Sequence, residues 1–71
     1  MKGVYIALNR IKEIRKEKGI TQSFLALLAN VSQPYINDLE NNRRGAKPET
    51  MKRIADALGV PVDDLVDRKA G

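Results

Sequence analysis

Apolar residues recur along this chain at the spacing of helices rather than of strands. Residues 51 to 58 are the clearest case, with apolar residues at i, i+3, i+4 and i+7, which places them on one face of a helix. Shorter stretches repeat this spacing, and no segment after residue 8 predicts a strand. The predicted helices are residues 9 to 18, 22 to 29, 33 to 41, 48 to 58 and 61 to 66. We therefore expect an all-α fold class, a compact bundle of five short helices.

The second and third predicted helices are separated by only a few residues. Asn30 follows the second helix and tolerates the positive φ of a helix end. Ser32 can cap the third helix with its hydroxyl group. Pro34 falls in the first turn of that helix, but its ring disfavours helical geometry at Gln33, so Gln33 is a second candidate for the cap. Residues 22 to 41 are thus predicted to form a helix-turn-helix.

The chain has 71 residues, which is enough for one domain but not for two. We expect residues 9 to 66 to form that domain and residues 67 to 71 to be a frayed tail. Residues 1 to 8 are expected to be an N-terminal arm, although their apolar content also allows a short strand or an earlier start of the first helix.

The third predicted helix has an unusual outer face. With steps of about 100° per residue, Ile36 and Leu39 share one side of it. The opposite side carries short polar groups, where a surface helix usually carries long charged ones. Amides of Gln and Asn can pair with adenine and a carboxylate can accept from cytosine, so this face suits contact with base edges. An ordinary solvated face is an equally good interpretation of the pattern. The residues concerned are Gln33, Pro34, Asn37 and Asp38.

The net charge of the chain favours contact with nucleic acid over an ordinary solvated face. The chain has 13 Lys or Arg and 9 Asp or Glu, a net charge of +4. Residues 1 to 53 hold eleven basic and five acidic residues, a balance of +6, whereas residues 54 to 71 have a balance of −2. A basic domain favours a polyanionic partner such as nucleic acid, although many small domains are basic for no such reason.

The residue types that are missing narrow the function further. The chain has no Cys and no His, so it lacks disulfides, thiolate metal ligands and the commonest general base. It also lacks a Gly-rich phosphate loop and a cluster of metal ligands. We therefore expect no enzyme activity, no metal and no cofactor. No apolar run approaches the roughly 20 residues that span a membrane, and we expect a cytoplasmic protein.

Several short motifs follow one another in a fixed order. They are Ile11-Lys-Glu-Ile-Arg15, Gly19-Ile-Thr-Gln22, Ala26, Val31-Ser32, Ile36, Leu39-Glu40-Asn41, Pro48 and Ile54-Ala-Asp-Ala-Leu-Gly-Val60. Each motif is weak alone, but their order and spacing over residues 9 to 66 resemble the lambda-repressor-like, Cro-type helix-turn-helix family.

This resemblance implies that the third helix enters the major groove of double-stranded DNA while the second crosses the backbone. It assigns base reading to Gln33, Pro34, Asn37 and Asp38. It assigns phosphate contacts to Gln22, Tyr35, Asn41, Arg43, Arg44 and Lys47. Arg15 and Glu40 match a pair that ties the first helix to the third in several members, with two separate surface charges as the alternative.

The resemblance also implies a function. The chain is expected to be a sequence-specific transcriptional regulator, a repressor that acts as a homodimer on a palindromic operator. The alternative is an antitoxin-type module that captures a small protein partner and also binds its own operator.

The sequence departs from the family pattern at several positions. Asn30 and Asn42 stand where many members have Gly, and the loop before Pro48 is one residue longer than in some. More informative is an apolar patch on the second helix, at positions that are usually polar. Either residues 4 to 6 or a second subunit would cover this patch, and we expect the former. The patch consists of Phe24, Leu27 and Leu28.

Overall fold

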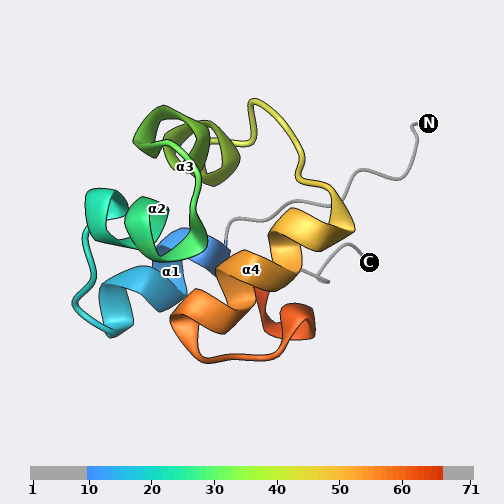
Figure 1. Ribbon diagram of the computed structural model, residues 1–71. Coiled ribbons are helices and arrows are strands. Elements are labelled where there is room, and N and C mark those ends of the chain that lie inside the picture. Colours follow the sequence, from blue (N-terminus) through green and yellow to red (C-terminus); the bar gives the residue numbers. More distant parts are fainter. Residues whose placement is uncertain (1–9, 67–71) are drawn as a thin grey trace.

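The computed structural model describes residues 10–66 of the chain. This part contains four α-helices and one short 3₁₀ helix, and no strand (Figure 1). The all-α expectation is therefore confirmed. The expected arm at residues 1 to 8 and tail at 67 to 71 lie outside the described residues. The elements are α1 Arg10–Glu17, α2 Gln22–Ala29, α3 Gln33–Glu40, α4 Pro48–Leu58 and η1 Val62–Leu65.

The fifth predicted helix is shorter and tighter than expected. It is a single 3₁₀ turn, in which the N–H of Asp64 donates to the carbonyl of Pro61 at 3.0 Å and the N–H of Val66 donates to that of Asp63 at 3.4 Å. Bonds to the residue three positions back define this helix type, which persists only over short segments. The sequence pattern located the element, but four residues are too few to distinguish the two helix types.

The helix boundaries follow from local capping. The hydroxyl of Thr21 accepts the N–H of Phe24 at 3.0 Å, and that of Ser32 accepts the N–H of Tyr35 at 3.2 Å. Ser32, rather than Gln33, is therefore the cap of α3. Asn30 ends α2 with a φ of 60°, the left-handed conformation expected of it, and Asn42 has a φ of 58°.

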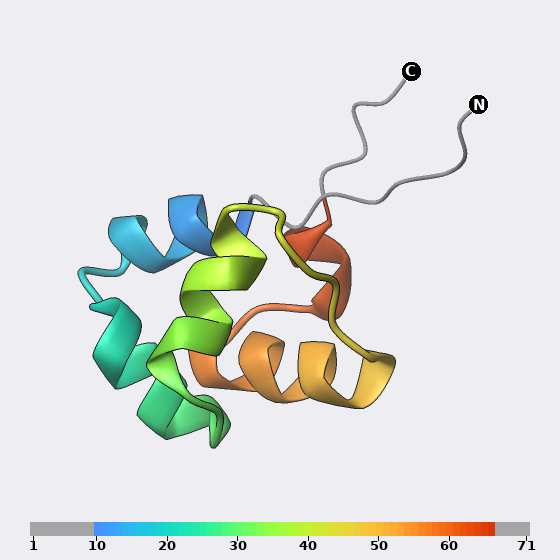
Figure 2. The same ribbon diagram turned by 90° about the horizontal axis from the view of Figure 1, so that it is seen from above.

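The helices pack around one common core (Figure 2). α2 packs against α3 and α4, while α1 packs against α3 and η1. Met51 was expected in the buried stripe of α4 but is only partly buried. The fully packed apolar residues are Ile11, Ile14, Leu25, Ala26, Ala29, Ile36, Leu39, Ile54, Ala55, Leu58 and Leu65.

Two leucines of α2 allow a matched test of this core. Leu25 is 0% exposed, whereas Leu27 is 73% exposed. Leu25→Ala should lower the free energy of unfolding by about 2–5 kcal/mol, because it leaves a cavity. Leu27→Ala should change it by no more than about 0.5 kcal/mol. Urea denaturation measures both, and equal losses would show that α2 faces the core differently.

Candidate nucleic-acid interface

The tight connection between α2 and α3 sets the geometry of the site. Only Asn30, Val31 and Ser32 separate the two helices. The left-handed Asn30 reverses the chain, and the N–H of Val31 then donates to the carbonyl of Ala26 at 3.0 Å. Partly buried Val31 packs against the core. These contacts hold α3 across α2 and leave the outer side of α3 free.

A buried ion pair joins α1 to the end of α3. The Nε of Arg15 donates to Oε2 of Glu40 at 2.6 Å, and its Nη2 donates to Oε1 at 3.1 Å. The third nitrogen, Nη1, donates to the carbonyl of Ile20 at 2.9 Å. All three guanidinium nitrogens thus have partners, which is the condition under which a buried charge is tolerated.

Hydrogen bonds through two glutamines connect this ion pair to the surface. Nε2 of Gln22 donates to Oε1 of Glu40 at 2.9 Å. Nε2 of Gln33 then donates to Oε1 of Gln22 at 3.4 Å, a long bond between the first residues of α2 and α3. The two glutamines therefore lie side by side at one end of the motif, although they are 11 residues apart in sequence.

The exposed side of α3 also contacts the loop that follows it. Nη1 of Arg43 lies 3.4 Å from Oδ1 of both Asn37 and Asp38. Nδ2 of Asn41 donates to the carbonyl of Asn37 at 2.8 Å and lies 3.3 Å from its Oδ1. Four of the candidate residues are thus brought together, with Arg43 placed beside two candidate base readers.

The remaining candidates lie around this group. The guanidinium of Arg44 stacks over the ring of Tyr35, 4.5 Å from its centroid, a cation–π contact. Pro34 is exposed in the first turn of α3. Lys47 is exposed and precedes α4, at the other end of the loop. Among residues 10–66, the side-chain hydrogen bonds, ion pairs and ring contacts join neither Pro34 nor Lys47 to another candidate residue.

One contact was not foreseen from the sequence. Nε of Arg53, on α4, donates to the carbonyl of Ala29 at the end of α2 at 3.2 Å. This bond ties α4 to the motif. No local pattern could have indicated it, because the two residues are 24 positions apart and Arg53 lies beside an ordinary apolar stripe.

Residues 10–66 hold neither a metal-binding group nor a membrane-spanning helix. No group of three or more acidic side chains is placed to hold a metal ion there. None of the helices in this part combines the length and apolar character needed to cross a membrane.

Two short helices at a tight turn, with polar side chains on the outer side of the second, define the helix-turn-helix class of DNA-binding domains. A helix-turn-helix family model matches residues 11–65. The chain belongs to the Cro-type, lambda-repressor-like helix-turn-helix family, a family of DNA-binding transcriptional regulators.

Two similar sequences illustrate this membership. The chain is 44% identical over 57 residues to the immunity repressor protein of Bacillus phage phi105. This alignment covers 80% of this chain and 40% of the repressor. It is 36% identical over 58 residues to the HTH-type transcriptional regulator DdrOP3 of Deinococcus deserti. This alignment covers 82% of this chain and 45% of the regulator. The chain thus spans less than half the length of these relatives.

Solved structures of similar proteins superpose on this chain over most of its length. The restriction-modification controller protein C.AhdI of Aeromonas hydrophila superposes with a TM-score of 0.78 at 28% identity, covering 80% of this chain and 86% of that protein. SinR of Bacillus subtilis in complex with DNA superposes with a TM-score of 0.76 at 34% identity, covering 80% of this chain and 92% of that one.

The buried pair can be tested against an exposed one. Glu40→Gln leaves the guanidinium of Arg15 buried without a counter-charge, which should cost about 3–5 kcal/mol of unfolding free energy. Asp38→Asn removes the exposed partner of Arg43, 3.4 Å away, and should cost no more than about 1 kcal/mol. Urea denaturation of both variants makes the comparison. Equal losses would contradict a structural role for the buried pair.

Proposed function

We propose that this chain is a sequence-specific DNA-binding domain of a transcriptional repressor, which acts as a homodimer on a palindromic operator. The observation that carries the proposal is the exposed polar side of α3, where Gln33, Asn37 and Asp38 lie with the basic residue Arg43 beside them. Their amide and carboxylate groups match the donors and acceptors of base edges in the major groove.

The residues around the polar side of α3 support the same mode of DNA binding. Gln22 lies at the N-terminus of α2, where a side-chain amide and backbone N–H groups can contact phosphate. Tyr35, Asn41, Arg43, Arg44 and Lys47 supply further polar and positive groups next to α3. The relative SinR was crystallised with DNA, and the phage relative is an immunity repressor, which favours repression.

The small size of the proposed reading surface supports a homodimer. One α3 presents only a few candidate base-reading side chains, and proteins of this class gain specificity by placing two such helices about 34 Å apart along the duplex. A two-fold protein then requires an inverted repeat in the DNA. Selection of binding sites from random duplex DNA tests this, because it should yield inverted repeats rather than single short sites.

A second candidate function is an antitoxin-type module that binds a small protein partner as well as its operator. The exposed Phe24, Leu27 and Leu28 favour a protein contact of some kind. A solved relative is a complex of the SinR and SinI proteins, so protein partners occur among similar chains.

Phosphate contacts should make binding depend steeply on salt. Each phosphate neutralised by Lys or Arg contributes a slope of about −0.9 to log K against log salt concentration. Arg43→Ala and Arg44→Ala should therefore each weaken binding to all sequences and flatten the slope by about 1 unit. Fluorescence anisotropy over a salt series measures this.

Lys12→Ala is the matched control, because it removes one exposed positive charge from α1. It should leave the slope unchanged. A wild-type affinity that is independent of salt would contradict DNA binding of the usual kind.

Loss of a base contact should act differently from loss of a phosphate contact. Gln33→Ala should remove about 1–3 kcal/mol of discrimination at one base pair per half-site. Its affinity for unrelated DNA should stay close to that of the wild type. Site selection with both proteins measures this, and an identical selected motif would show that Gln33 does not read a base.

A further inference from the structure

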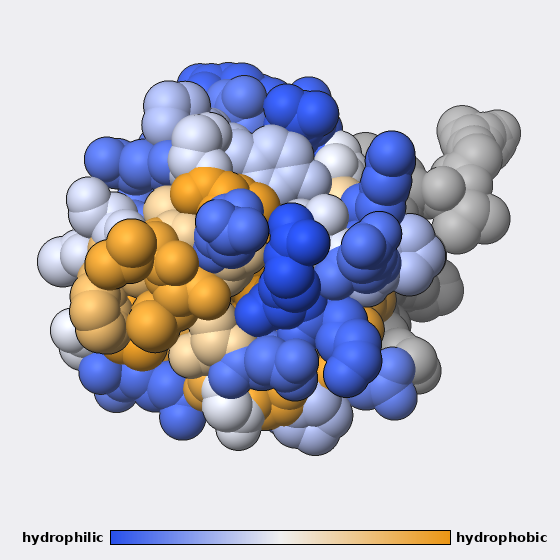
Figure 3. All heavy atoms as spheres, viewed as in Figure 1, coloured by the Kyte–Doolittle hydropathy of each residue, from blue (hydrophilic) through white to orange (hydrophobic). Residues whose placement is uncertain are grey.

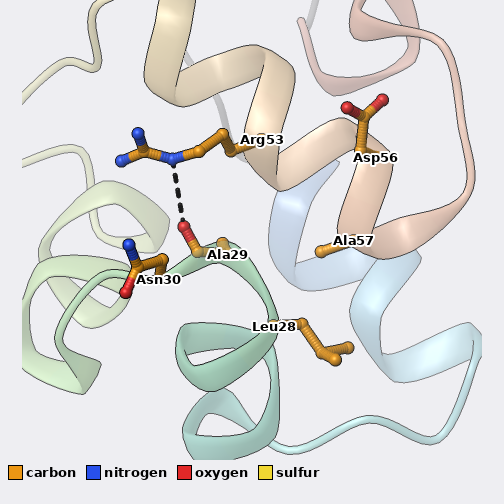
Figure 4. Close-up of a pocket in the computed structure, with 6 residues that line it drawn as sticks. All are labelled: Leu28, Ala29, Asn30, Arg53, Asp56 and Ala57. Atoms are coloured by element: carbon orange, nitrogen blue, oxygen red, sulfur yellow. Dashed lines mark hydrogen bonds between the residues drawn. The ribbon is translucent and has the colours of Figure 1, made fainter.

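Five arginines lie in the part of the chain that the structure describes, and four of them use their N–H groups on partners within the chain. Three bind carboxylates, and Arg53 donates to the carbonyl of Ala29 (Figure 4). Arg44 differs from all four. The hydrogen bonds and ion pairs of residues 10–66 give its guanidinium group no acceptor, so its five N–H donors are available to a ligand.

The guanidinium group of Arg44 is held through its face instead. Its Cζ lies over the ring of Tyr35, 4.5 Å from the ring centroid. The π electrons of the ring attract the positive charge. Because the guanidinium group is planar, this contact occupies its face and leaves open the edge, where the N–H groups lie. Arg44 is therefore positioned without using the donors that would bind an anion.

The ring of Tyr35 is a fixed support for this contact. Tyr35 is partly buried and packs against the hydrophobic core. Its backbone N–H donates to the hydroxyl of Ser32 at 3.2 Å, which fixes the first turn of α3 around it. A tyrosine side chain has only two rotatable bonds before its hydroxyl, so packing on one side leaves the ring little freedom.

The loop that carries Arg44 is fixed to α3 by a Schellman motif. Asn42 has the left-handed conformation, with a φ of 58°. Its N–H donates to the carbonyl of Leu39 at 3.1 Å, and the N–H of Arg43 donates to that of Asp38 at 2.8 Å. These two bonds define the motif, which reverses the chain at the end of a helix. The reversal comes directly before Arg44 and brings it back beside α3.

Tyr35 borders the side of α3 that is proposed to read bases. With about 100° per residue, it lies between Asp38 on the outer side and buried Leu39, about 60° from the former and about 40° from the latter. Hydrophilic residues cover α3 at the top of Figure 3, whereas the apolar area lies lower down, over α2. When one side of a helix faces base edges, groups at its border lie near the DNA backbone. A guanidinium group there suits a phosphate, which its N–H groups can bind in pairs.

We propose that Tyr35 is a positioning residue for DNA binding, whose ring holds Arg44 so that the edge of the guanidinium group meets a phosphate. This inference rests on the proposed function. It gives Tyr35 a role through Arg44, in place of the phosphate contact of its own that the family resemblance implies. An arginine side chain loses conformational freedom when it binds a phosphate, and one that is already held loses less. The ring thereby increases affinity without a contact of its own with DNA.

Two substitutions separate the ring of Tyr35 from its hydroxyl group. Tyr35→Leu removes the ring but keeps an apolar side chain against the core. It should weaken binding to duplex DNA about two- to tenfold in fluorescence anisotropy, because Arg44 is no longer held. Tyr35→Phe keeps the ring and should lose less affinity than Tyr35→Leu. Lys12→Gln, on α1, is the control and should not change the affinity. Melting temperatures of all variants show whether the fold is intact.

A double-mutant cycle connects the effect to Arg44. In a protein that carries Arg44→Ala, the further substitution Tyr35→Leu should cause little additional loss of affinity, because the ring has no guanidinium group left to hold. A ring that contacts DNA directly, or that only stabilises α3, would produce the same loss in both backgrounds.

NMR spectroscopy of the protein without DNA reports the contact itself. The ring current of an aromatic side chain shields protons that lie over its face. The Hδ protons of Arg44 should therefore resonate upfield of their usual position in the wild type and in Tyr35→Phe. They should return to that position in Tyr35→Leu.

Three results would overturn the inference. The first is a loss of affinity in Tyr35→Phe as large as that in Tyr35→Leu, which would assign the DNA contact to the hydroxyl group. The second is an equal effect of Tyr35→Leu with and without Arg44, including no effect in either background. The third is a wild-type protein in which the Hδ protons of Arg44 are not shielded. A wild-type protein in which they are shielded but which binds no DNA would instead contradict the proposed function.

Discussion

The buried ion pair between Arg15 and Glu40 determines how the helices of this domain meet. Burial of two charges is costly, and only complete pairing offsets the cost. Here the guanidinium reaches Glu40 twice and the carbonyl of Ile20 once, while Gln22 also donates to the carboxylate. These groups come from α1, the corner that follows it, α2 and α3. A displacement of any of these elements would leave a buried charge unpaired, so the pair fixes their relative positions.

The same pair influences the surface that is proposed to meet DNA. Gln22 is held by Glu40 on one side and lies next to Gln33 on the other, so the side chain at the start of α3 is oriented before any ligand arrives. A group held in place loses less conformational entropy on binding. The contacts of Arg43 with Asn37 and Asp38 are long and exposed, and they can be exchanged for contacts with phosphate at little cost.

Local features of this fold could be predicted from the sequence, and distant contacts could not. The caps at Thr21 and Ser32, and the left-handed Asn30, depend on a few neighbouring residues, and their chemistry is visible in the chain. The bond from Arg53 to Ala29 depends instead on how α4 crosses α2. For the site, residue types and family spacing indicated the side of α3. The pairing of Gln22 with Gln33 requires the packed helices, because 11 residues separate the two.

α2 presents two different surfaces, one polar at its start and one apolar in its last turns. Its first residue, Gln22, belongs to the candidate DNA interface, whereas Leu27 and Leu28 in its last turns are apolar and exposed. The buried residues Leu25 and Ala29 anchor the helix in the core, so both surfaces have a fixed position relative to α3 and α4.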